Sequence, residues 1–259
     1  MKIEIRGVTQ AYRDPRGQTF HALDGVDLAV DANEFLAIVG PSGCGKSTLL
    51  HLVAGFIPVT RGEILVDGRP IAGPGPDRGV VFQDPALLPW RTVEGNVLLA
   101  LEEREVERAQ RRRIVARLVE AIGLRGFERF YPKQLSGGMR QRVAIARTLA
   151  LDPEILLMDE PFAALDSQTR TLMQEDLLGI WKEQRKTVLF VTHDVREAVY
   201  LADRVVVMTA RPGRIKKVID TRFDVPDEQV TATREFTETC TEIWALLREE
   251  IGPRAARHT

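Results

Sequence analysis

The sequence predicts an α/β fold with an N-terminal antiparallel β-subdomain and an inserted α-helical subdomain. In the first thirty residues, apolar and polar side chains alternate, which is typical of strands that have one exposed face. Further along, short continuous apolar runs recur between helical stretches, which indicates a parallel sheet covered by helices on both faces. The chain of 259 residues is 44% hydrophobic and 28% charged, a globular composition that excludes disordered and fibrous proteins.

Two alternating segments form the expected antiparallel part. In the first, Ile3 and Ile5 point to one face and their charged neighbours point to the other. In the second, Val26, Leu28 and Val30 alternate in the same way with small or charged residues. We therefore expect both segments to be half-buried strands.

Four apolar runs and three helical stretches form the expected α/β body. The runs are Phe35–Val39, Ile155–Met158, Val188–Thr192 and Val205–Met208. The helical stretches are Ser47–Ala54, Met139–Leu149 and Ser167–Glu183. This order predicts buried strands in a parallel sheet, connected by helices.

Residues 85–150 are mostly helical in pattern, and we expect them to form a subdomain inserted into a domain that spans residues 1–235. Within them, the stretch 106–122 has Ile114, Leu118 and Ile122 at helical spacing. Its other face is rich in glutamate and arginine, which indicates a solvated helix surface, with nucleic-acid contact as the alternative.

A C-terminal tail, residues 236–259, is expected to contain a further amphipathic helix. Its apolar residues Phe236, Ile243, Trp244 and Leu247 are predicted to lie on one side. Contact with another molecule of the same chain and packing onto the core are two open roles for this helix.

Charge and cysteine content indicate the compartment. With 36 Lys+Arg and 37 Asp+Glu the net charge is −1, which argues against bulk nucleic-acid binding. Cys44 and Cys240 are too few for a disulfide framework or a zinc cluster, so a reducing compartment is expected. The N-terminus lacks the pattern of a signal peptide, and the longest uncharged window, 47–60, is too short to cross a bilayer. We expect a soluble cytoplasmic protein with no nucleic-acid partner.

The segment from Gly40 to Ser47 predicts a phosphate-binding loop. It reads GPSGCGKS and matches the pattern G-x-x-x-x-G-K-[ST] in full, between a strand-like run and a helix. Glycines let successive backbone N–H groups face a phosphate, and the helix N-terminus adds a favourable dipole. Lys46 is expected to reach the β- and γ-phosphates, and the Ser47 hydroxyl to bind Mg²⁺.

Two carboxylates follow the apolar run 155–158. Ligands of open α/β sheets bind beyond the carboxyl ends of the strands, so both are expected near the phosphates. Asp159 is predicted to hold Mg²⁺, directly or through water. Glu160 is placed to act as the general base on the attacking water.

Two further polar residues end strand-like runs. His193 follows the run 188–192 and is expected beside the same phosphates, with capping or packing as the alternative role. Gln83 follows the run 79–82, and its amide can contact both metal and water.

A second anion site is predicted at Ser136, Gly137 and Gly138. These residues precede the helix 139–149 and offer a hydroxyl and two glycine N–H groups at its N-terminus. One nucleotide needs only one phosphate loop, so we expect this second site to serve a nucleotide held by a different molecule.

Together these motifs resemble those of the nucleotide-binding subunit of ABC (ATP-binding cassette) transporters, over roughly residues 1–235. The phosphate loop, Gln83, the segment LSGGM, the Asp159–Glu160 pair and His193 occur in the family's order. The resemblance implies a P-loop NTPase (RecA-like) core, ATP hydrolysis, and ATP and Mg²⁺ as ligands. It also implies a head-to-tail homodimer, in which each ATP lies between the phosphate loop of one subunit and Ser136–Gly138 of the other.

The resemblance adds two residues to the expected site and shows two departures. Tyr12 takes the place of the family's adenine-stacking aromatic residue, with a surface aromatic residue as the alternative. Asp166 resembles the residue that couples the two nucleotide sites. Met139 stands where the family usually has glutamine, and the loop 163–166 has alanine where serine is more usual.

The candidate site is therefore defined by three sets of residues. Catalysis is assigned to Glu160, His193 and Gln83. Metal binding is assigned to Ser47, Gln83 and Asp159. Nucleotide binding is assigned to Tyr12, Gly40, Pro41, Ser42, Gly43, Cys44, Gly45, Lys46, Ser47, Thr48, Ser136, Gly137, Gly138 and Asp166.

The resemblance also implies separate membrane partners, and it favours an importer. The Leu87–Trp90 segment is expected either to form a socket for a helix of a transmembrane permease subunit or to pack inside the helical subdomain. The segments 81–97 and 209–215 are most similar to the nitrate, sulfonate and taurine importers, with thiamine or pyrimidine-precursor importers as the alternative. A periplasmic or surface solute-binding protein would act indirectly. The protein would then be peripheral, at the cytoplasmic face of the inner membrane.

Two other classes of function compete with this interpretation. A soluble ABC ATPase acting on DNA or the ribosome would be expected to show sustained heptads or a second phosphate loop, and the sequence has neither. A plain P-loop kinase would leave LSGGM and His193 unexplained.

Overall fold

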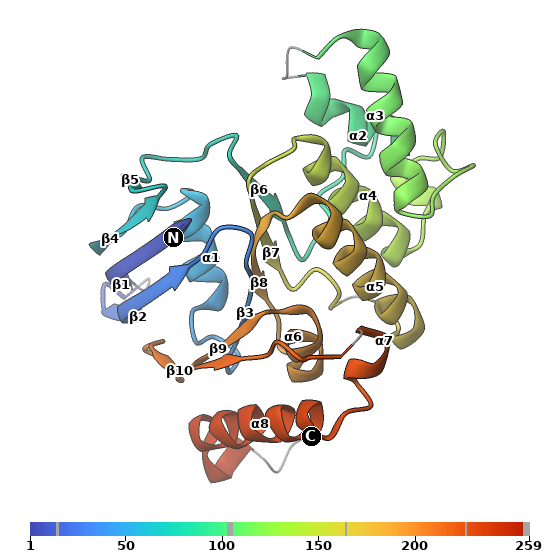
Figure 1. Cartoon of the computed structure of the whole chain (residues 1–259). Coiled ribbons are helices and arrows are strands. Elements are labelled where there is room, and N and C mark those ends of the chain that lie inside the picture. Colours follow the sequence, from blue (N-terminus) through green and yellow to red (C-terminus); the bar gives the residue numbers. More distant parts are fainter. Residues whose placement is uncertain (14–15, 103–105, 164, 226, 256–259) are drawn as a thin grey trace. The chain divides into compact units, whose positions relative to one another are not determined.

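The computed structural model describes residues 1–13, 16–102, 106–163, 165–225 and 227–255 (Figure 1). These residues form two compact units. The first comprises Met1–Gly75 and Lys186–Thr259, and the second comprises Pro76–Arg185.

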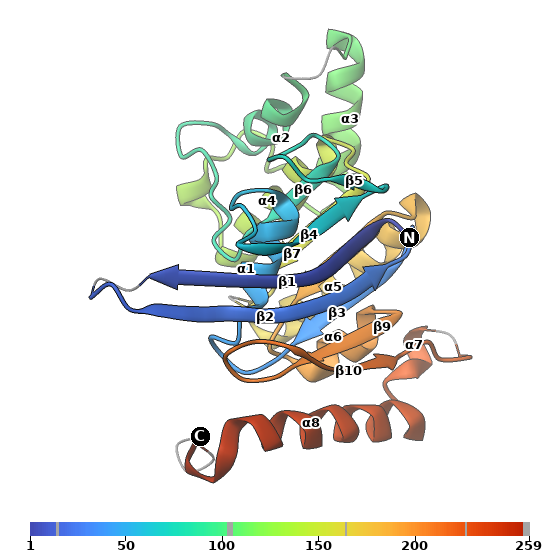
Figure 2. The same cartoon turned by 90° about the vertical axis from the view of Figure 1, so that its left-hand side faces the viewer.

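An antiparallel sheet of four strands forms one part of the first unit. It consists of β1 (Ile3–Arg13), β2 (Thr19–Val30), β4 (Arg61–Val66) and β5 (Arg69–Pro70), in the order β2-β1-β4-β5. Figure 2 shows the long strands β1 and β2 side by side. Ile3 and Ile5 are buried and Arg6 is exposed, which confirms the predicted alternation. Lys2 is also buried, and its ammonium donates to Asp67 at 2.6 Å.

Four further strands, most of them in parallel pairing, form the other sheet part of the first unit. They are β3 (Phe35–Val39), β8 (Thr187–Val191), β9 (Arg204–Met208) and β10 (Ile215–Asp220). β3 pairs in parallel with both β8 and β9, and β10 pairs antiparallel with β9. Every residue of β3 and β8 is buried, as the continuous apolar runs predicted. Helix α1 (Lys46–Ala54) follows β3, and α6 (Val195–Leu201) follows β8.

The chain ends with α7 (Asp227–Val230) and α8 (Arg234–Ala255), and α8 packs on α6 and β9 (Figure 1). The predicted apolar side of α8 needs one correction. Phe236, Cys240, Ile243 and Leu247 are buried, but Trp244 is 43% exposed. Each helical residue turns the side-chain direction by about 100°, so the stripe through Ile243 and Leu247 leaves Trp244 at its edge. Packing onto the core therefore accounts for the buried stripe of this helix.

The second unit combines one parallel strand pair with helices. β6 (Arg78–Val81) pairs with β7 (Ile155–Asp159). The helices are α2 (Val93–Glu102), α3 (Arg108–Ala121), the short 3₁₀ helix η1 (Pro132–Gln134), α4 (Gly137–Ala150) and α5 (Ser167–Gln184). The described residues between 85 and 150 contain helices and no strand. The predicted subdomain boundaries stay a prediction, because the compact unit also includes β6, β7 and α5.

Helix α3 has the predicted amphipathic character. Val115, Leu118 and Val119 are buried, whereas Arg112 and Arg113 are exposed, which agrees with a solvated outer face. Across the described ranges, the helices all lack the combination of length and apolarity that a membrane crossing requires.

Candidate active site

The phosphate loop begins where β3 ends. Because β3 and β8 are parallel, with Ile38 opposite Val191, Gly40 and His193 each lie two residues beyond a paired position. They therefore leave the sheet at the same edge, which is where open α/β sheets bind ligands. The structure thus brings Gly40 and His193 to one edge of the first unit.

Glycine is required at several positions of this loop. A Cβ at Gly40 would lie 2.7 Å from the Cys44 Sγ, and one at Gly45 would lie 2.7 Å from the Leu23 Cδ2. Gly43 and Gly45 also have positive φ angles, 73° and 107°. Side chains here would clash with the residues packed against the loop or strain its backbone, so these positions require glycine.

Lys46 and the N-terminus of α1 give the loop its positive character. The Lys46 Nζ donates to the carbonyl oxygens of Gly40 at 2.9 Å and Pro41 at 3.3 Å, so the ammonium is held against the loop. The residue before α1 is Gly45, and it makes no side-chain cap. The first-turn N–H groups, together with the helix dipole, are therefore suited to an anion.

These observations fit the polyphosphate of a nucleotide. The donors are backbone N–H groups and one ammonium, and the glycines allow the backbone conformation that the loop adopts. Ser47 lies in the first turn of α1, where a hydroxyl can bind Mg²⁺. No cluster of three or more His, Cys, Asp or Glu suited to a metal occurs among the described residues. In nucleotide sites, Mg²⁺ takes only one or two of its ligands from the protein and others from the phosphates. The Ser47 hydroxyl is a suitable protein ligand of this kind.

His193 is exposed, and the neighbouring residues perform the structural roles. Asp194 caps α6 by accepting from the backbone N–H groups of Arg196 at 2.9 Å and Glu197 at 3.3 Å. Thr192 is buried and its hydroxyl donates to Glu197. The cap of α6 is therefore Asp194, and the role of His193 stays a prediction.

The two carboxylates of the second unit differ in backbone conformation. Asp159 ends β7 and is buried, while Glu160 follows it with a φ of 45° and is half-buried. A left-handed conformation costs a residue other than glycine about 1–2 kcal/mol. Strain of this kind is concentrated at functional sites, where it aims a side chain in a required direction.

Helix α4 holds the backbone around Gln83. Gln83 itself is exposed, just beyond β6. Gln141 donates to the Phe82 carbonyl at 3.2 Å, and Arg147 donates to the carbonyls of Pro85 at 3.0 Å and Ala86 at 2.8 Å. Burial of the Arg147 guanidinium lowers its pKa. Sequence reasoning did not identify Arg147, because its partners are backbone carbonyls distant in sequence.

The predicted second anion site lies at the N-terminus of α4. The Ser136 hydroxyl caps this helix by accepting from the Met139 N–H at 3.2 Å. A Cβ at Gly138 would lie 3.0 Å from Thr169 and 3.3 Å from Leu165, so glycine allows the N-termini of α4 and α5 to approach.

Asp166 caps α5 by accepting from the Thr169 N–H at 3.0 Å, and this bond lowers the pKa of its carboxyl. The second unit therefore brings Ser136–Gly138 close to Asp166 through the contact between Gly138 and Thr169. Ala164, in the loop where alanine replaces the family's serine, lies outside the described residues.

Asn96 is a buried residue that sequence reasoning missed. It is 0% exposed, and its Oδ1 accepts from the Leu88 N–H at 2.9 Å. Its Nδ2 faces the carbonyl oxygens of Leu88, Arg91 and Thr92 at 3.0–3.2 Å. Asn96 therefore fixes the segment 87–92, in which Trp90 is 70% exposed. Internal packing, the alternative considered for this segment, does not hold for Trp90.

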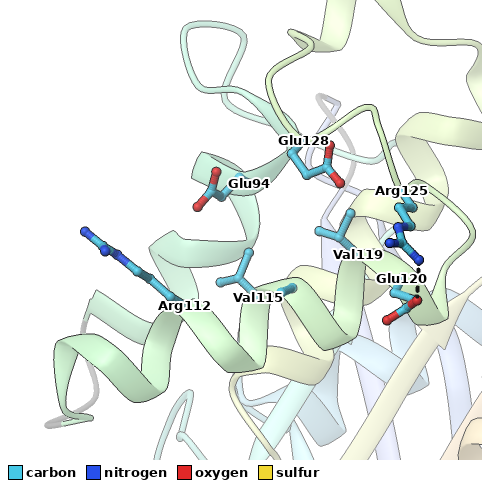
Figure 3. A pocket seen from close by; sticks show the side chains of 8 residues that line it. Glu94, Arg112, Val115, Val119, Glu120, Arg125 and Glu128 are labelled. Atoms are coloured by element: carbon cyan, nitrogen blue, oxygen red, sulfur yellow. Dashed lines mark hydrogen bonds and ion pairs between the residues drawn. The ribbon is translucent and has the colours of Figure 1, made fainter.

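A pocket of about 310 Å³ lies elsewhere in the second unit, between α2, α3 and the segment that follows α3 (Figure 3). Val115 and Val119 line its apolar part, and Arg125 pairs with Glu120 at its edge. The residues that line it include none of those assigned to nucleotide, metal or catalysis.

The candidate residues are thus divided between the units. The first unit contains Tyr12, the loop 40–48 and His193, and the second contains Gln83, Ser136–Gly138, Asp159, Glu160 and Asp166.

Comparison with known proteins gives consistent matches. The family model described as ABC transporter matches residues 23–163. The chain is 47% identical to the taurine import ATP-binding protein TauB of Rhizobium johnstonii, over 93% of this chain and 94% of that protein. It is 48% identical to the nitrate import ATP-binding protein NrtD of Synechococcus elongatus, over 86% of this chain and 82% of that protein.

A solved structure is also similar over most of the chain. It is a dimeric post-hydrolysis state of the ATP-binding cassette MJ0796 bound to ADP and Pi, with a TM-score of 0.77 and 32% identity. The match covers 85% of this chain and 99% of that one. The predicted P-loop NTPase core is thereby confirmed.

Proposed function

Because the chain belongs to the ABC transporter family and is an ABC-type ATPase, we propose that it is the ATP-hydrolysing subunit of an importer for a small anion such as a sulfonate, taurine or nitrate. The similarity to TauB and NrtD, over 94% and 82% of their lengths, supports the importer class and the anionic solute. Within this proposal the protein acts at the cytoplasmic face of the membrane, bound to permease subunits. A solute-binding protein delivers the solute to these permease subunits.

The observation that carries the ATPase role is the loop Gly40–Ser47. Its glycines, the buried Lys46 and the uncapped N-terminus of α1 form a site for phosphates at the edge of the sheet. ATP would bind with its phosphates in this loop and its adenine on Tyr12, whose ring already pairs with Phe20 at 5.8 Å. Ser47, with Asp159 and Gln83, would hold Mg²⁺, which neutralises phosphate charge when bound.

Hydrolysis would depend on residues of both units. Glu160 would accept a proton from the attacking water, and His193 and Gln83 would orient that water and the terminal phosphate. The hydroxyl and N–H groups of Ser136–Gly138 would bind the ATP of a second subunit in a head-to-tail dimer, with Asp166 connecting the two sites. ATP binding would close the dimer and move the permease, and phosphate release would reopen it.

Trp90 and its neighbours are the proposed contact with the permease. Trp90 is exposed while Leu87 and Leu88 are half-buried, and Asn96 fixes the backbone of the segment. A rigid, exposed aromatic residue beside apolar side chains is suited to receive a helix of another protein.

The test of the ATPase mechanism is steady-state hydrolysis by a Glu160→Gln variant. This change retains size and hydrogen bonding but removes the base, so we expect hydrolysis to fall by at least about 10²-fold while ATP still binds and dimers accumulate. Turnover close to that of the unmodified protein would remove Glu160 from the role of base.

The shared-site arrangement has its own test in mixed dimers. A Ser136→Arg subunit paired with an unmodified subunit should lose hydrolysis at the phosphate loop of the unmodified partner. An effect limited to the variant's own phosphate loop would contradict the head-to-tail arrangement.

Uptake of labelled taurine, an alkanesulfonate and nitrate in cells with and without the gene would identify the solute. If uptake of all three were the same in both kinds of cell, the anion proposal would be rejected.

A further inference from the structure

The segment Thr209–Arg214 packs against the phosphate loop. It connects β9 to β10, and Gly213 joins it to β2 by donating to the Ala22 carbonyl at 2.9 Å and accepting from the Asp24 N–H at 3.1 Å. A Cβ at Gly213 would lie only 2.0 Å from the Cys44 carbonyl oxygen. The segment therefore lies directly against the back of the phosphate loop, and its position is closely determined.

This packing brings Arg211 to the rim of the candidate nucleotide site. The Arg211 Nε donates to the Gly43 carbonyl at 3.3 Å, and its guanidinium carbon lies 5.1 Å from the centre of the Phe20 ring. Phe20 is the cross-strand partner of Tyr12, and their rings are 5.8 Å apart. Arg211 thus links the phosphate loop to the aromatic pair on which adenine is proposed to stack.

The guanidinium has capacity for a further ligand. Arg211 is exposed, and its contact with Gly43 uses Nε. Among the described residues its two Nη groups have no hydrogen-bond acceptor, although an arginine can donate five hydrogen bonds. Stacking on Phe20 holds the guanidinium plane without using those donors. A planar pair of N–H donors held in this way is suited to phosphate oxygens.

We propose that Arg211 is a nucleotide-binding residue that contacts the α-phosphate of ATP and ADP. This assignment rests on the proposed nucleotide site at the loop 40–48. Lys46 reaches the Gly40 and Pro41 carbonyls, whereas Arg211 lies at Gly43 beside the aromatic pair. In a bound nucleotide, the ribose and the α-phosphate lie between the phosphates held by the loop and the base held by Tyr12. Of these two groups only the α-phosphate is an anion, so it is the group that a guanidinium would bind.

The experiment measures equilibrium binding of ATP and ADP to the full chain, with Arg211→Ala and Arg211→Lys as variants. Losing a charge-assisted hydrogen bond weakens binding by about tenfold or more, and the α-phosphate is common to both nucleotides. We therefore expect Arg211→Ala to lose affinity for ATP and ADP by the same factor. Arg211→Lys, which keeps the charge but not the plane, should lose less. In hydrolysis assays KM should rise while kcat at saturation stays unchanged.

Arg214→Ala is the matched control, because Arg214 belongs to the same segment but pairs with Asp24. Its nucleotide affinity should stay unchanged. An equal loss in both alanine variants, no loss in Arg211→Ala, or a loss for ATP alone would each overturn the assignment. A Lys46→Ala variant distinguishes a wrong role for Arg211 from a wrong location of the nucleotide site. If Lys46→Ala binds normally, the proposed nucleotide site is wrong, and if it fails to bind while Arg211→Ala binds normally, only the role of Arg211 is wrong.

Discussion

Replacing Asn96 with alanine should destabilise the second unit through the segment 87–92. Asn96 is fully buried, and one amide group satisfies backbone groups at both ends of this segment. Alanine removes the acceptor for the Leu88 N–H and the donors for the facing carbonyl oxygens. The segment is then left with buried polar groups that have lost their partners.

The expected loss follows from the hydrogen bonds. The Nδ2 group has two hydrogens for the three carbonyl oxygens of Leu88, Arg91 and Thr92, so it makes two full bonds, and Oδ1 accepts one more. At about 1 kcal/mol for each net bond, Asn96→Ala should lower the free energy of unfolding by about 3 kcal/mol. Asn96→Asp should cost more, because it places a carboxylate opposite those carbonyl oxygens.

Two measurements check this prediction. Urea unfolding gives the free energy, and hydrogen exchange at the Leu88 amide gives the local effect, which should be about 10²-fold faster exchange for about 3 kcal/mol. Glu94→Ala, at an exposed position of the same helix, is the control and should stay within about 0.5 kcal/mol of the unmodified protein. Unchanged Leu88 exchange in Asn96→Ala would show that water or neighbouring groups replace the amide, and the reasoning would be wrong.

Three further predictions concern the loop, the C-terminal helix and the permease contact. Gly213→Ala places a Cβ 2.0 Å from the Cys44 carbonyl oxygen, so thermal unfolding should show a loss of about 1–3 kcal/mol, whereas Gly73→Ala, with nothing within 4 Å, should be neutral. The Lys216 ammonium, and then the Ala210 N–H, lower the pKa of the Glu250 carboxyl below its ordinary value of 4.5. The stability that the Glu250 carboxylate contributes is therefore present above pH 4.5 and lost as pH falls through the pKa of the folded state. The Ala210 N–H, which donates to Glu250, should lose protection from hydrogen exchange over the same pH range, and Glu250→Gln should abolish this change. Trp90→Ala should leave stability within about 0.5 kcal/mol but weaken co-purification of the permease, and an equal amount of bound permease would reject the contact.

Much of the fold was predictable because its signals are local. The run Phe35–Val39 is β3 to the residue, since five consecutive apolar side chains can be buried only between two layers. β8 begins one residue before its predicted start, at Thr187, because the buried Thr187 hydroxyl accepts from the Asn33 N–H at 2.9 Å. Helix α4 begins at Gly137, since the Ser136 cap compensates for the low helix propensity of two glycines.

Some residues of the candidate site could be predicted from the sequence and others could not. The phosphate loop could be predicted because it is contiguous and its glycines are required by its own backbone. Arg147 and Arg211 could not, because each binds backbone carbonyls that only the folded chain brings within reach. The carbonyl partners of Asn96 are near it in sequence, but its complete burial depends on the packing of the folded chain. An asparagine or arginine in a helix or turn is usually solvated, and nothing in its sequence neighbours indicates otherwise.

The left-handed backbone of Glu160, together with its proposed role as the base, places the demands of stability and of hydrolysis in opposition at one residue. Glycine adopts a φ of 45° without the steric cost that Glu160 bears, so Glu160→Gly relieves about 1–2 kcal/mol of strain while removing the carboxylate. If variants were selected for heat resistance alone, glycine would be favoured at this residue, and the proposed base would be lost. Engineers who stabilise such a protein should hold position 160 constant and seek their gains elsewhere.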